Sequence, residues 1–569
     1  MITGLFLGLA GRLVFLHLSP HDSIDEKIDK MHSVEKPISV GRGRILDRNG
    51  YVFAIDLPAR DIWINPVCIK TNGVEGEVAA ALSRTLGMEA DRLFVKIKGS
   101  MRRGLRIKRF VEEDVGRAVE DLKLEGVWTR TLSTRNYPHG KMLCHALGFL
   151  NWGGKASGGI EQRFNSDLKG RDGLLRTVRD GRRRELYDRR AVEVEPLTGS
   201  NIYLTIDQNI QQMVEDALDK LLVERECKGA WAVVQRVRTG EILAMASRPA
   251  FNLNEFRFSD SEERRNRAIA YTYEPGSTFK PLIVAAALNE GIVKPNDRID
   301  CENGCWSYKR ILLRDCHNFG ILSVSDIVKK SSNIGAAKIA LKLGDARLEK
   351  YLKAYRLGMK TGIELPGEEG GILHGTSAWS SISATRLAMG HELTVTAVQL
   401  LNAVCAIVNG GYLMQPTLIH RVTNAAGEET YKSRPHVLTR VVNAKTSAQM
   451  RRIMMTVTEE GGTGLNARVP GYAVGGKTGT AQKAIPGGYS KSAHMASFVG
   501  FLPAENPEIA MIVVVDEPQP VHFGGMVAAP VFREVVEQVV RYLHILPSAQ
   551  AEYARYRNSN FRNGGGREL

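Results

Sequence analysis

The chain has 569 residues, 43% of them hydrophobic, so it is too long for one compact core and has the composition of a globular protein with two or more domains. This composition excludes a disordered or fibrous protein. The formal net charge of +15 is compatible with a nucleic acid, an anionic membrane surface or an acidic polymer as a neighbour. The basic residues lack a zinc-finger pattern or an aromatic RNA-binding signature around them, so we expect no nucleic-acid binding.

The first segment, residues 1–18, is apolar apart from Thr3, Arg12 and His17. A bilayer span needs about 20 residues, so this segment is short for one. No charged region precedes it and no small-residue cleavage site follows, which disfavours a cleaved signal peptide. We expect a truncated membrane anchor, with Met1 inside a longer apolar segment whose basic cytoplasmic beginning is missing. The alternative is an ordinary amphipathic helix.

The segments that follow predict a stalk and a first domain. Residues 19–40 are polar and charged, which is typical of a stalk that leaves a membrane. In residues 41–199 short helical and strand patterns alternate with many charges, and Asn49 with Gly50 predicts a tight hairpin turn. We find no catalytic constellation in this stretch and interpret it as an elongated pedestal domain.

A second domain is expected over residues 200–546. Asp207 is placed to cap a helix whose apolar residues recur with helical period. Five strands are expected, at residues 231–235, 241–246, 473–480, 496–502 and 509–515, followed by a closing helix with an apolar stripe over residues 532–543. These elements predict an antiparallel sheet covered by helices, within a multidomain α/β (α+β) fold. Residues 547–569 are polar and predict a disordered tail.

Seven cysteines are too few for a disulfide scaffold, and an odd number leaves at least one thiol outside any intrachain pairing. Cys301, Cys305 and Cys316 cluster in sequence with His317 beside them, which invites comparison with a zinc site. The spacing lacks the paired short loops of structural zinc sites. We therefore expect no metal here, and instead a disulfide or buried thiols.

Three short motifs occur in order along the second domain: S-T-F-K at residues 277–280, S-S-N at 331–333 and K-T-G-T at 477–480. Each alone is weak evidence, because Ser277 and Lys280 can merely begin a helix, Asn333 can be a satisfied polar residue, and K-T-G can end a plain strand. Their coincidence, in order and in matching predicted structure, is a strong signal of an active site.

The residue types suit nucleophilic catalysis. A serine hydroxyl needs a nearby base, and a lysine three residues further along a helix lies on the same face, so Ser277 is the candidate nucleophile and Lys280 the candidate base. Lys280 is a base only when neutral. Burial at the head of the apolar helix over residues 281–288, together with the charge of Lys477 across the cleft, is expected to lower its pKa.

The remaining motif residues predict a substrate site. The backbone amides of Ser277 and Thr480 are the natural oxyanion donors, and Gly479 allows close approach of a substrate backbone. Lys477 and the hydroxyls of Thr478 and Thr480 are placed to hold a substrate carboxylate.

Ser331 is placed to relay a proton, and Asn333 to orient the peptide amide of the substrate. His391 and His494 raise the alternative of Ser-His catalysis, but no G-x-S-x-G motif surrounds Ser277. We expect both histidines to be surface or core residues.

The three motifs resemble the S-x-x-K, S-x-N and K-T-G set of penicillin-binding proteins and related serine β-lactamases. The resemblance covers nearly everything from the anchor to about Ile545 and extends through residues 42–50, 159–161, 239–245, 274–277 and 496–501. Over this length the chain resembles class B penicillin-binding proteins, particularly the division-specific septal D,D-transpeptidase. Asn333 favours the septal group, because the elongation group usually carries an aspartate there.

This resemblance implies a single-pass protein of the cytoplasmic membrane with its catalytic domain on the periplasmic side. Ser277 would attack a D-Ala-D-Ala stem peptide of peptidoglycan, release the terminal D-Ala and transfer the acyl group to an amine on a neighbouring strand. β-Lactams would acylate Ser277 as substrate mimics. No cofactor is implied, and the implied partners are a membrane glycosyltransferase and other divisome proteins.

Two rival functions keep the same motifs. A β-lactamase or carboxypeptidase would use water in place of the acceptor amine, but the large pedestal and the apolar first segment disfavour it. A non-catalytic divisome scaffold would keep the fold and bind through the pedestal, but the intact motifs disfavour that.

Overall fold

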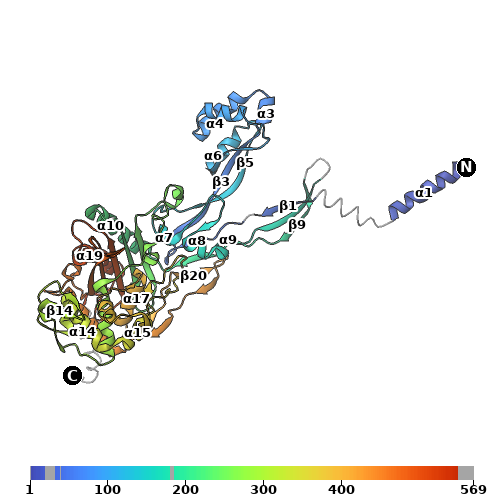
Figure 1. Ribbon diagram of the computed structural model, residues 1–569. Coiled ribbons are helices and arrows are strands. Elements are labelled where there is room, and N and C mark those ends of the chain that lie inside the picture. Colours follow the sequence, from blue (N-terminus) through green and yellow to red (C-terminus); the bar gives the residue numbers. More distant parts are fainter. Residues whose placement is uncertain (1, 19–32, 39, 180–184, 549–569) are drawn as a thin grey trace, which may run out of the picture.

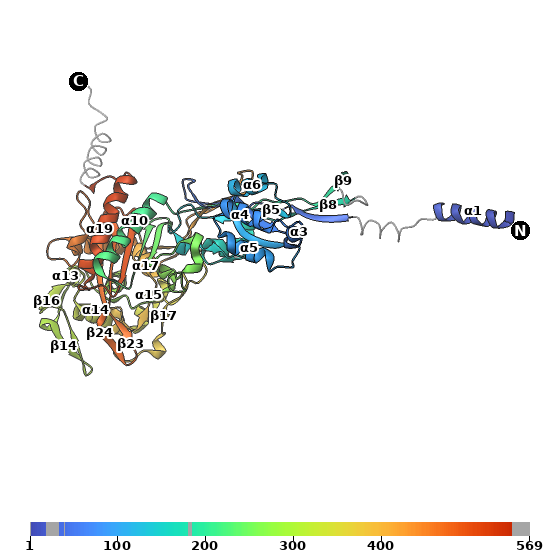
Figure 2. The same cartoon turned by 90° about the horizontal axis from the view of Figure 1, so that it is seen from above.

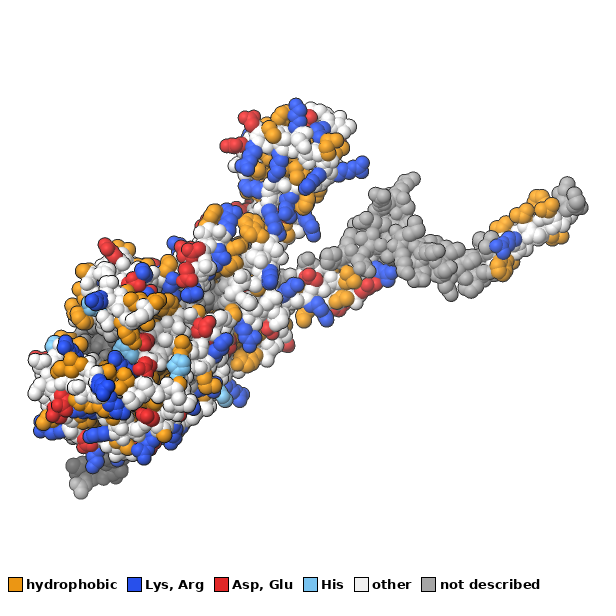
Figure 3. Space-filling view, in the orientation of Figure 1, with side chains coloured by type: hydrophobic (Ala, Val, Ile, Leu, Met, Phe, Trp, Pro, Cys, Tyr) orange, Lys and Arg blue, Asp and Glu red, His pale blue; other side chains and the backbone are white. Residues whose placement is uncertain are grey.

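The computed structural model describes residues 2–18, 33–38, 40–179 and 185–548. The molecule is elongated, with the large C-terminal domain at one end and the pedestal rising from it (Figures 1 and 2). Helix α1 (Ile2–Leu18) carries exposed hydrophobic side chains between Leu5 and Phe15 (Figure 3). Over the described part of the chain, no helix combines the length and the apolar character needed to cross a bilayer.

The pedestal is built on the long strand β3 (Val52–Ile64), which pairs antiparallel with both β4 (Leu105–Glu112) and β5 (Val127–Asn136). Four helices gather toward its tip around a small core that includes Ile62, Leu82 and Leu93 (Figure 1). These helices are α3 (Pro66–Thr71), α4 (Glu75–Leu86), α5 (Ala90–Lys98) and α6 (Glu113–Asp121).

One sheet runs from the pedestal into the C-terminal domain. Strand β2 (Ile45–Leu46) turns into β3 at Gly50, whose φ of +96° is the left-handed conformation expected of the Asn-Gly turn. On its other side β2 pairs in parallel with β10 (Asn201–Leu204), and β10 pairs with β20 (Ile419–Thr423), which carries β21 (Glu429–Lys432) at the edge. The two domains are therefore joined by hydrogen-bonded strands as well as by the chain.

Part of the segment expected to be a stalk is a strand. Strand β1 (Ser33–Ile38) pairs with β8 (Gly173–Arg179), which pairs with β9 (Glu185–Val194). Because residues 33–38 read as polar and charged, their own pattern gave no sign of this pairing with a segment far along the chain. Residues 19–32 lie outside the described residues, as do residues 549–569, where most of the disordered tail was expected.

The C-terminal domain has a five-stranded sheet in the order β12-β11-β25-β24-β23, with every neighbouring pair antiparallel. All five expected strands are confirmed, with the bounds β11 (Gly229–Arg236), β12 (Ile242–Arg248), β23 (Gly475–Ile485), β24 (Gly488–Leu502) and β25 (Ile509–Asp516). Strand β23 lies at the edge of this sheet.

Helices cover both faces of the sheet. Helix α10 (Gln208–Arg225), capped as expected by Asp207, and α19 (Gly524–Tyr542) pack on one face through residues such as Val214 and Phe532. On the other face lie α12 (Lys280–Asn289), α17 (Ala397–Val408) and α18 (Ala444–Met455). The prediction of an antiparallel sheet covered by helices is confirmed.

Shorter elements complete the chain. The helices are α7 (Cys144–Leu147), α8 (Gly159–Arg163), α9 (Asn165–Lys169), α11 (Arg267–Ala270), α13 (Val324–Lys330), α14 (Asn333–Leu343), α15 (Asp345–Ala354) and α16 (Ser383–Ala388). The strands are β6 (Phe149–Leu150), β7 (Ala156–Ser157), β13 (Arg298–Asp300), β14 (Cys305–Tyr308), β15 (Ile311–Arg314), β16 (Ile321–Ser323), β17 (Ile372–Leu373), β18 (Leu393–Thr394), β19 (Tyr412–Met414) and β22 (Val437–Arg440).

Candidate active site

The S-T-F-K motif lies on a 3₁₀ turn, η2 (Gly276–Phe279), that leads directly into α12. Helix α12 is buried on every side, so Lys280 at its first position is fully buried. Pro281 follows in the first turn, where a missing N–H costs no helical hydrogen bond. The turn therefore places Ser277 at the mouth of the site and Lys280 beneath it.

The amine of Lys280 joins the first two motifs. Its Nζ lies 3.0 Å from Ser277 Oγ, 3.2 Å from Ser331 Oγ, 2.6 Å from the Ser331 carbonyl oxygen and 2.7 Å from Asn333 Oδ1. Burial lowers the pKa of Lys280 to about 8, against the opposing effect of Asp315 and Cys316. The neutral amine is therefore far more accessible near physiological pH than that of an ordinary lysine.

The S-S-N turn is held by a residue that the sequence did not single out. Ser331 has a left-handed backbone, with φ of +64°, and the next residue, Ser332, caps α14 by accepting a hydrogen bond from Gly335 N at 2.9 Å. Asp315 accepts hydrogen bonds from Ser332 Oγ at 2.6 Å and from Ile334 N at 3.1 Å. Asp315 thus fixes the turn from a loop 17 to 19 residues before the residues it contacts, and no local motif marks it.

Asn333 uses its side chain within the protein. Its Oδ1 accepts from Lys280, and its Nδ2 donates to the Arg314 carbonyl oxygen at 2.9 Å. One N–H of Nδ2 is left for a ligand, so the expectation that Asn333 orients the substrate amide stays a prediction. The geometry makes Asn333 a positioning group for Lys280.

Lys477 lies on the edge strand β23 and is also fully buried. Its Nζ donates to the carbonyl oxygen of Thr478 at 3.0 Å and to Thr478 Oγ1 at 3.3 Å. Burial, followed by repulsion from Lys280, lowers the pKa of Lys477 well below its ordinary value. The repulsion between the two amines thus lowers the pKa of Lys477, whereas the lowered pKa of Lys280 is due to its own burial.

The rest of the K-T-G-T motif packs closely against η2, the turn that carries Ser277 and is called the nucleophile turn below. A Cβ on Gly479 would lie 2.8 Å from Thr278 Cγ2 and 3.1 Å from the Pro275 carbonyl oxygen. Glycine is therefore required by the protein's own packing, and its role in the approach of a substrate backbone stays a prediction. Thr478 Oγ1 donates to Thr463 Oγ1 at 2.9 Å.

The two expected oxyanion donors lie on adjoining segments. A Cβ on Gly276 would lie 3.4 Å from the Thr480 carbonyl oxygen, so the backbone before Ser277 runs beside Thr480. The Thr480 hydroxyl accepts a hydrogen bond from Gly524 N at 3.1 Å, so it is held at the start of α19. All eight residues of the predicted site are thus brought to one place: Ser277, Lys280, Ser331, Asn333, Lys477, Thr478, Gly479 and Thr480.

The cysteines and histidines take structural positions. All seven cysteines are free thiols, and the expected disulfide among Cys301, Cys305 and Cys316 is wrong. Of these three, Cys301 is buried, beside Ser332 Oγ at 3.4 Å, whereas Cys305 and Cys316 are exposed, so the alternative of buried thiols holds within this cluster for Cys301 alone. His494 is buried and stacks on another ring, as expected of a core residue.

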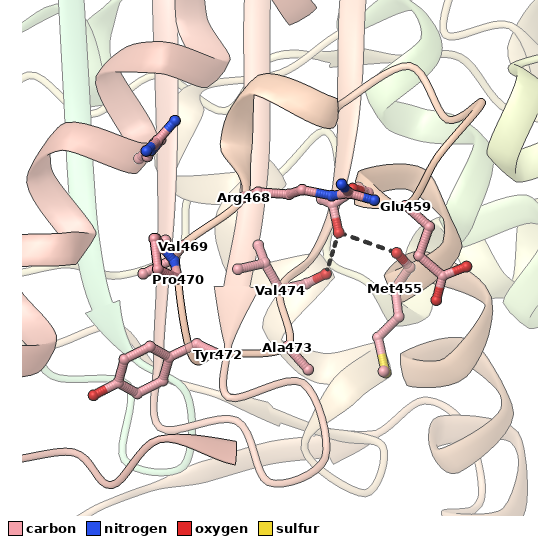
Figure 4. Close-up of a pocket in the computed structure, with 10 residues that line it drawn as sticks. Met455, Glu459, Arg468, Val469, Pro470, Tyr472, Ala473 and Val474 are labelled. Atoms are coloured by element: carbon pink, nitrogen blue, oxygen red, sulfur yellow. Dashed lines mark hydrogen bonds between the residues drawn. The ribbon is translucent and has the colours of Figure 1, made fainter. Parts of the chain in front are cut away.

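A separate cavity of about 350 Å³ lies behind the start of β23 (Figure 4). Its wall includes Met455, Glu459, Arg468 and Tyr472, and Thr458 Oγ1 donates to the Val474 carbonyl oxygen at 2.7 Å. None of the residues that line it belongs to the three motifs. This cavity therefore lies outside the candidate site.

Two family descriptions match the chain. Residues 230–537 match the penicillin binding protein transpeptidase domain, and residues 37–204 match the penicillin-binding protein dimerisation domain. The chain is 31% identical to the probable peptidoglycan D,D-transpeptidase PenA of Neisseria meningitidis over 550 residues, which cover 96% of this chain and 92% of the relative. It is 30% identical to the peptidoglycan D,D-transpeptidase FtsI of Escherichia coli over 546 residues, covering 95% and 90%.

A solved structure shares this architecture. Penicillin binding protein 2X from Streptococcus thermophilus superposes with a TM-score of 0.75 at 26% identity, covering 89% of this chain and 80% of that one. The agreement extends over both the pedestal and the C-terminal domain.

Proposed function

The chain belongs to the class B penicillin-binding proteins and is a peptidoglycan D,D-transpeptidase, and we propose that Ser277 is the nucleophile that forms its acyl-enzyme. The observation that carries this proposal is the contact between Ser277 Oγ and Lys280 Nζ at 3.0 Å. A buried amine of lowered pKa beside a hydroxyl is the arrangement that nucleophilic catalysis by serine requires.

The partners of Lys280 favour a role as the base. The Ser331 carbonyl oxygen and Asn333 Oδ1 can only accept hydrogen bonds, so they take the two N–H groups of a neutral amine. The lone pair of Nζ is then left for a hydroxyl, and the Ser277 O–H donates to it. Ser331 Oγ, 3.2 Å from the same Nζ, is placed to pass the proton on toward the leaving amine.

The substrate carboxylate is assigned to Lys477 and the hydroxyls of Thr478 and Thr480. Burial disfavours the ammonium form of Lys477 in the free protein. A bound carboxylate would restore that charge, and the pair would then lie in a water-poor site where an ion pair is strong. The backbone amides of Ser277 and Thr480 are assigned to the oxyanion.

The reaction proceeds in two acyl transfers. Ser277 Oγ attacks the carbonyl of the penultimate D-Ala while Lys280 takes its proton, and the terminal D-Ala leaves with a proton returned through Ser331. An amine of a neighbouring stem peptide then attacks the ester and loses its proton to Lys280, which returns that proton to Ser277 Oγ as the ester bond breaks. Penicillin and other β-lactams stop at the first step, because their leaving group stays attached.

The relatives of the chain support a proposal for its cellular setting. We place the chain in septal cell-wall synthesis at the cytoplasmic membrane, with its catalytic domain on the periplasmic side and a membrane glycosyltransferase among its divisome partners. Side chains of α1 from Leu5 to Phe15 include leucines, a valine and phenylalanines that are 56% to 72% exposed. Such an apolar surface is stable against lipid and costly in water, which supports contact of α1 with the membrane.

A hydrolase is the second candidate function. It differs from the transpeptidase in its acceptor, which is water in place of an amine. The experiment is intact-mass spectrometry of the protein after incubation with penicillin, followed by peptide mapping. We expect one adduct on the peptide that contains Ser277, and none in Ser277→Ala that is shown by circular dichroism to be folded. An adduct that persists in Ser277→Ala would overturn the nucleophile assignment, and release of the adduct within seconds would favour the hydrolase.

A further inference from the structure

A cavity of about 360 Å³ opens beside the nucleophile turn. Its wall begins at Glu274, three residues before Ser277, and continues through the segment that ends in β18. Gly276 N donates to the Gly390 carbonyl oxygen at 3.2 Å, which fixes this segment against the turn. We call the cavity the Glu274 pocket and define it by Glu274, His374, Trp379, Leu387, Glu392 and Leu393.

The Glu274 pocket is acidic, although the whole chain carries a net charge of +15. Glu274 Oε1 accepts hydrogen bonds from Glu392 N at 3.0 Å and from the Tyr489 hydroxyl at 3.1 Å. Its other oxygen, Oε2, is buried and has no hydrogen-bond partner among the described residues. Burial and the neighbouring Glu392 charge raise the pKa of Glu274, so its ionised carboxylate lacks a fully compensating positive charge.

Nearby basic groups do not supply that charge. Arg386 is close enough to oppose the shift of the Glu274 pKa, but within the described part of the chain no ion pair joins it to Glu274 or Glu392. Burial, Arg386 and Lys280 lower the pKa of His391 to about 4, so this ring is neutral at physiological pH. Its Nδ1 is likewise buried without a partner in the described structure.

The rest of the wall suits an aliphatic chain that ends in an amine. Leu387 and Leu393 give the pocket a buried apolar side. Trp379 also lines the pocket, and its indole N–H donates to the His374 carbonyl oxygen at 2.9 Å, so the ring offers no free donor to a ligand. An ammonium group near carboxylates and an aromatic face, on an alkyl stem against leucines, matches each of these features.

We propose that the Glu274 pocket binds the side-chain amino group of a diamino acid in a peptidoglycan stem peptide, with Glu274 and Glu392 as its counter-charges. This inference rests on the proposed transpeptidase function, because the pocket adjoins the serine to which a stem peptide becomes attached. The amino group can belong to the donor strand or to the acceptor strand, since both carry the same chemistry.

The test uses the full chain and two kinds of peptide. In the donor assay, acylation is measured with a peptide that ends in D-Ala-D-Ala and carries a lysine side chain, either free or Nε-acetylated. In the acceptor assay, an acyl-enzyme made from a thioester without an amino group partitions between water and a free lysine peptide. The two quantities are the preference for the free amine and the ratio of transfer to hydrolysis.

Removing one counter-charge identifies the strand. In Glu392→Gln and in Glu274→Gln, we expect one of the two quantities to fall at least about fivefold, because a charge-assisted contact is lost. A fall in the donor assay assigns the pocket to the donor strand, and a fall in the acceptor assay assigns it to the acceptor strand. The control is Glu534→Gln, an exposed glutamate on α19, in which both quantities stay at the wild-type value.

Rates are expressed per active site, counted by labelled penicillin in each variant. Glu392 is exposed, so its replacement tests the pocket even if Glu274→Gln does not fold. Both quantities unchanged in penicillin-titrated Glu392→Gln would overturn the pocket assignment. Wild-type protein that penicillin does not titrate would instead overturn the proposed function.

Discussion

Two walls of the candidate active site each bury a lysine completely, and they differ in how the amine is satisfied. Lys280 contacts polar atoms of three other residues, Ser277, Ser331 and Asn333. Lys477 donates only to its own neighbour Thr478 among the described residues. Because a buried polar group with few partners is costly, the wall around Lys280 is complete in the free protein, whereas we propose that an anionic substrate completes the wall around Lys477.

This difference separates chemistry from binding. Groups that are fixed before the substrate arrives need no reorganisation during the reaction, so changes around Lys280 are expected to lower the acylation rate constant. Changes around Lys477 are expected to act mainly on the concentration of substrate needed for saturation. The following predictions test this division.

The largest effect is expected for Lys280→Arg. Arginine keeps a positive charge but does not deprotonate at any accessible pH, so the variant lacks the base. We expect acylation by penicillin to slow by about 10³-fold, within the range for loss of a general base. The measurement is rapid-quench labelling with penicillin, and the control is Lys342→Arg on the exposed side of α14. Normal acylation of Lys280→Arg would remove Lys280 as the base.

The pH profile of acylation gives the next effect. Only neutral Lys280 accepts the proton of Ser277, and burial places the pKa of Lys280 at about 8. At saturating penicillin the rate constant is expected to rise about tenfold per pH unit below that pKa and to level off above it. A profile that is flat between pH 6 and 8, in protein that circular dichroism shows to be folded, would contradict this assignment.

Asp315→Ala is expected to have a smaller effect on the same rate constant. The substitution removes the acceptor that holds Ser332 and Ile334, so the turn that carries Ser331 loses its fixed position. Loss of such a supporting group typically costs about 10- to 100-fold in activity. The control is Asp345→Ala, an exposed aspartate at the start of α15. A change in the penicillin concentration at half-saturation without a change in the rate constant would show that Asp315 acts on substrate binding and not on the surroundings of Lys280.

Asp315 also shows where prediction from sequence ends. The five strands, the capped helix α10 and the meeting of the three motifs follow from periodic patterns and short signatures, which are local. The support given by Asp315 joins segments that are distant in the chain and carries no pattern of its own. The same reason hides β1, whose partner strand begins 135 residues after it ends, and the roles of Asn333 and Gly479, which depend on what the fold brings beside them.

The smallest effect is expected for Thr463→Ala, on the wall of Lys477. Thr463 accepts the hydrogen bond of Thr478 Oγ1 at 2.9 Å, so its loss frees a hydroxyl that is assigned to the substrate carboxylate. One neutral hydrogen bond is worth about 1 kcal/mol, or roughly fivefold. Because the freed hydroxyl no longer has to leave Thr463 to bind the carboxylate, we expect the penicillin concentration at half-saturation to fall by that factor. The rate constant at saturation is expected to stay within about twofold, since the contacts of Lys280 are untouched. A fall of the rate constant with unchanged half-saturation would show that the two walls act as one unit.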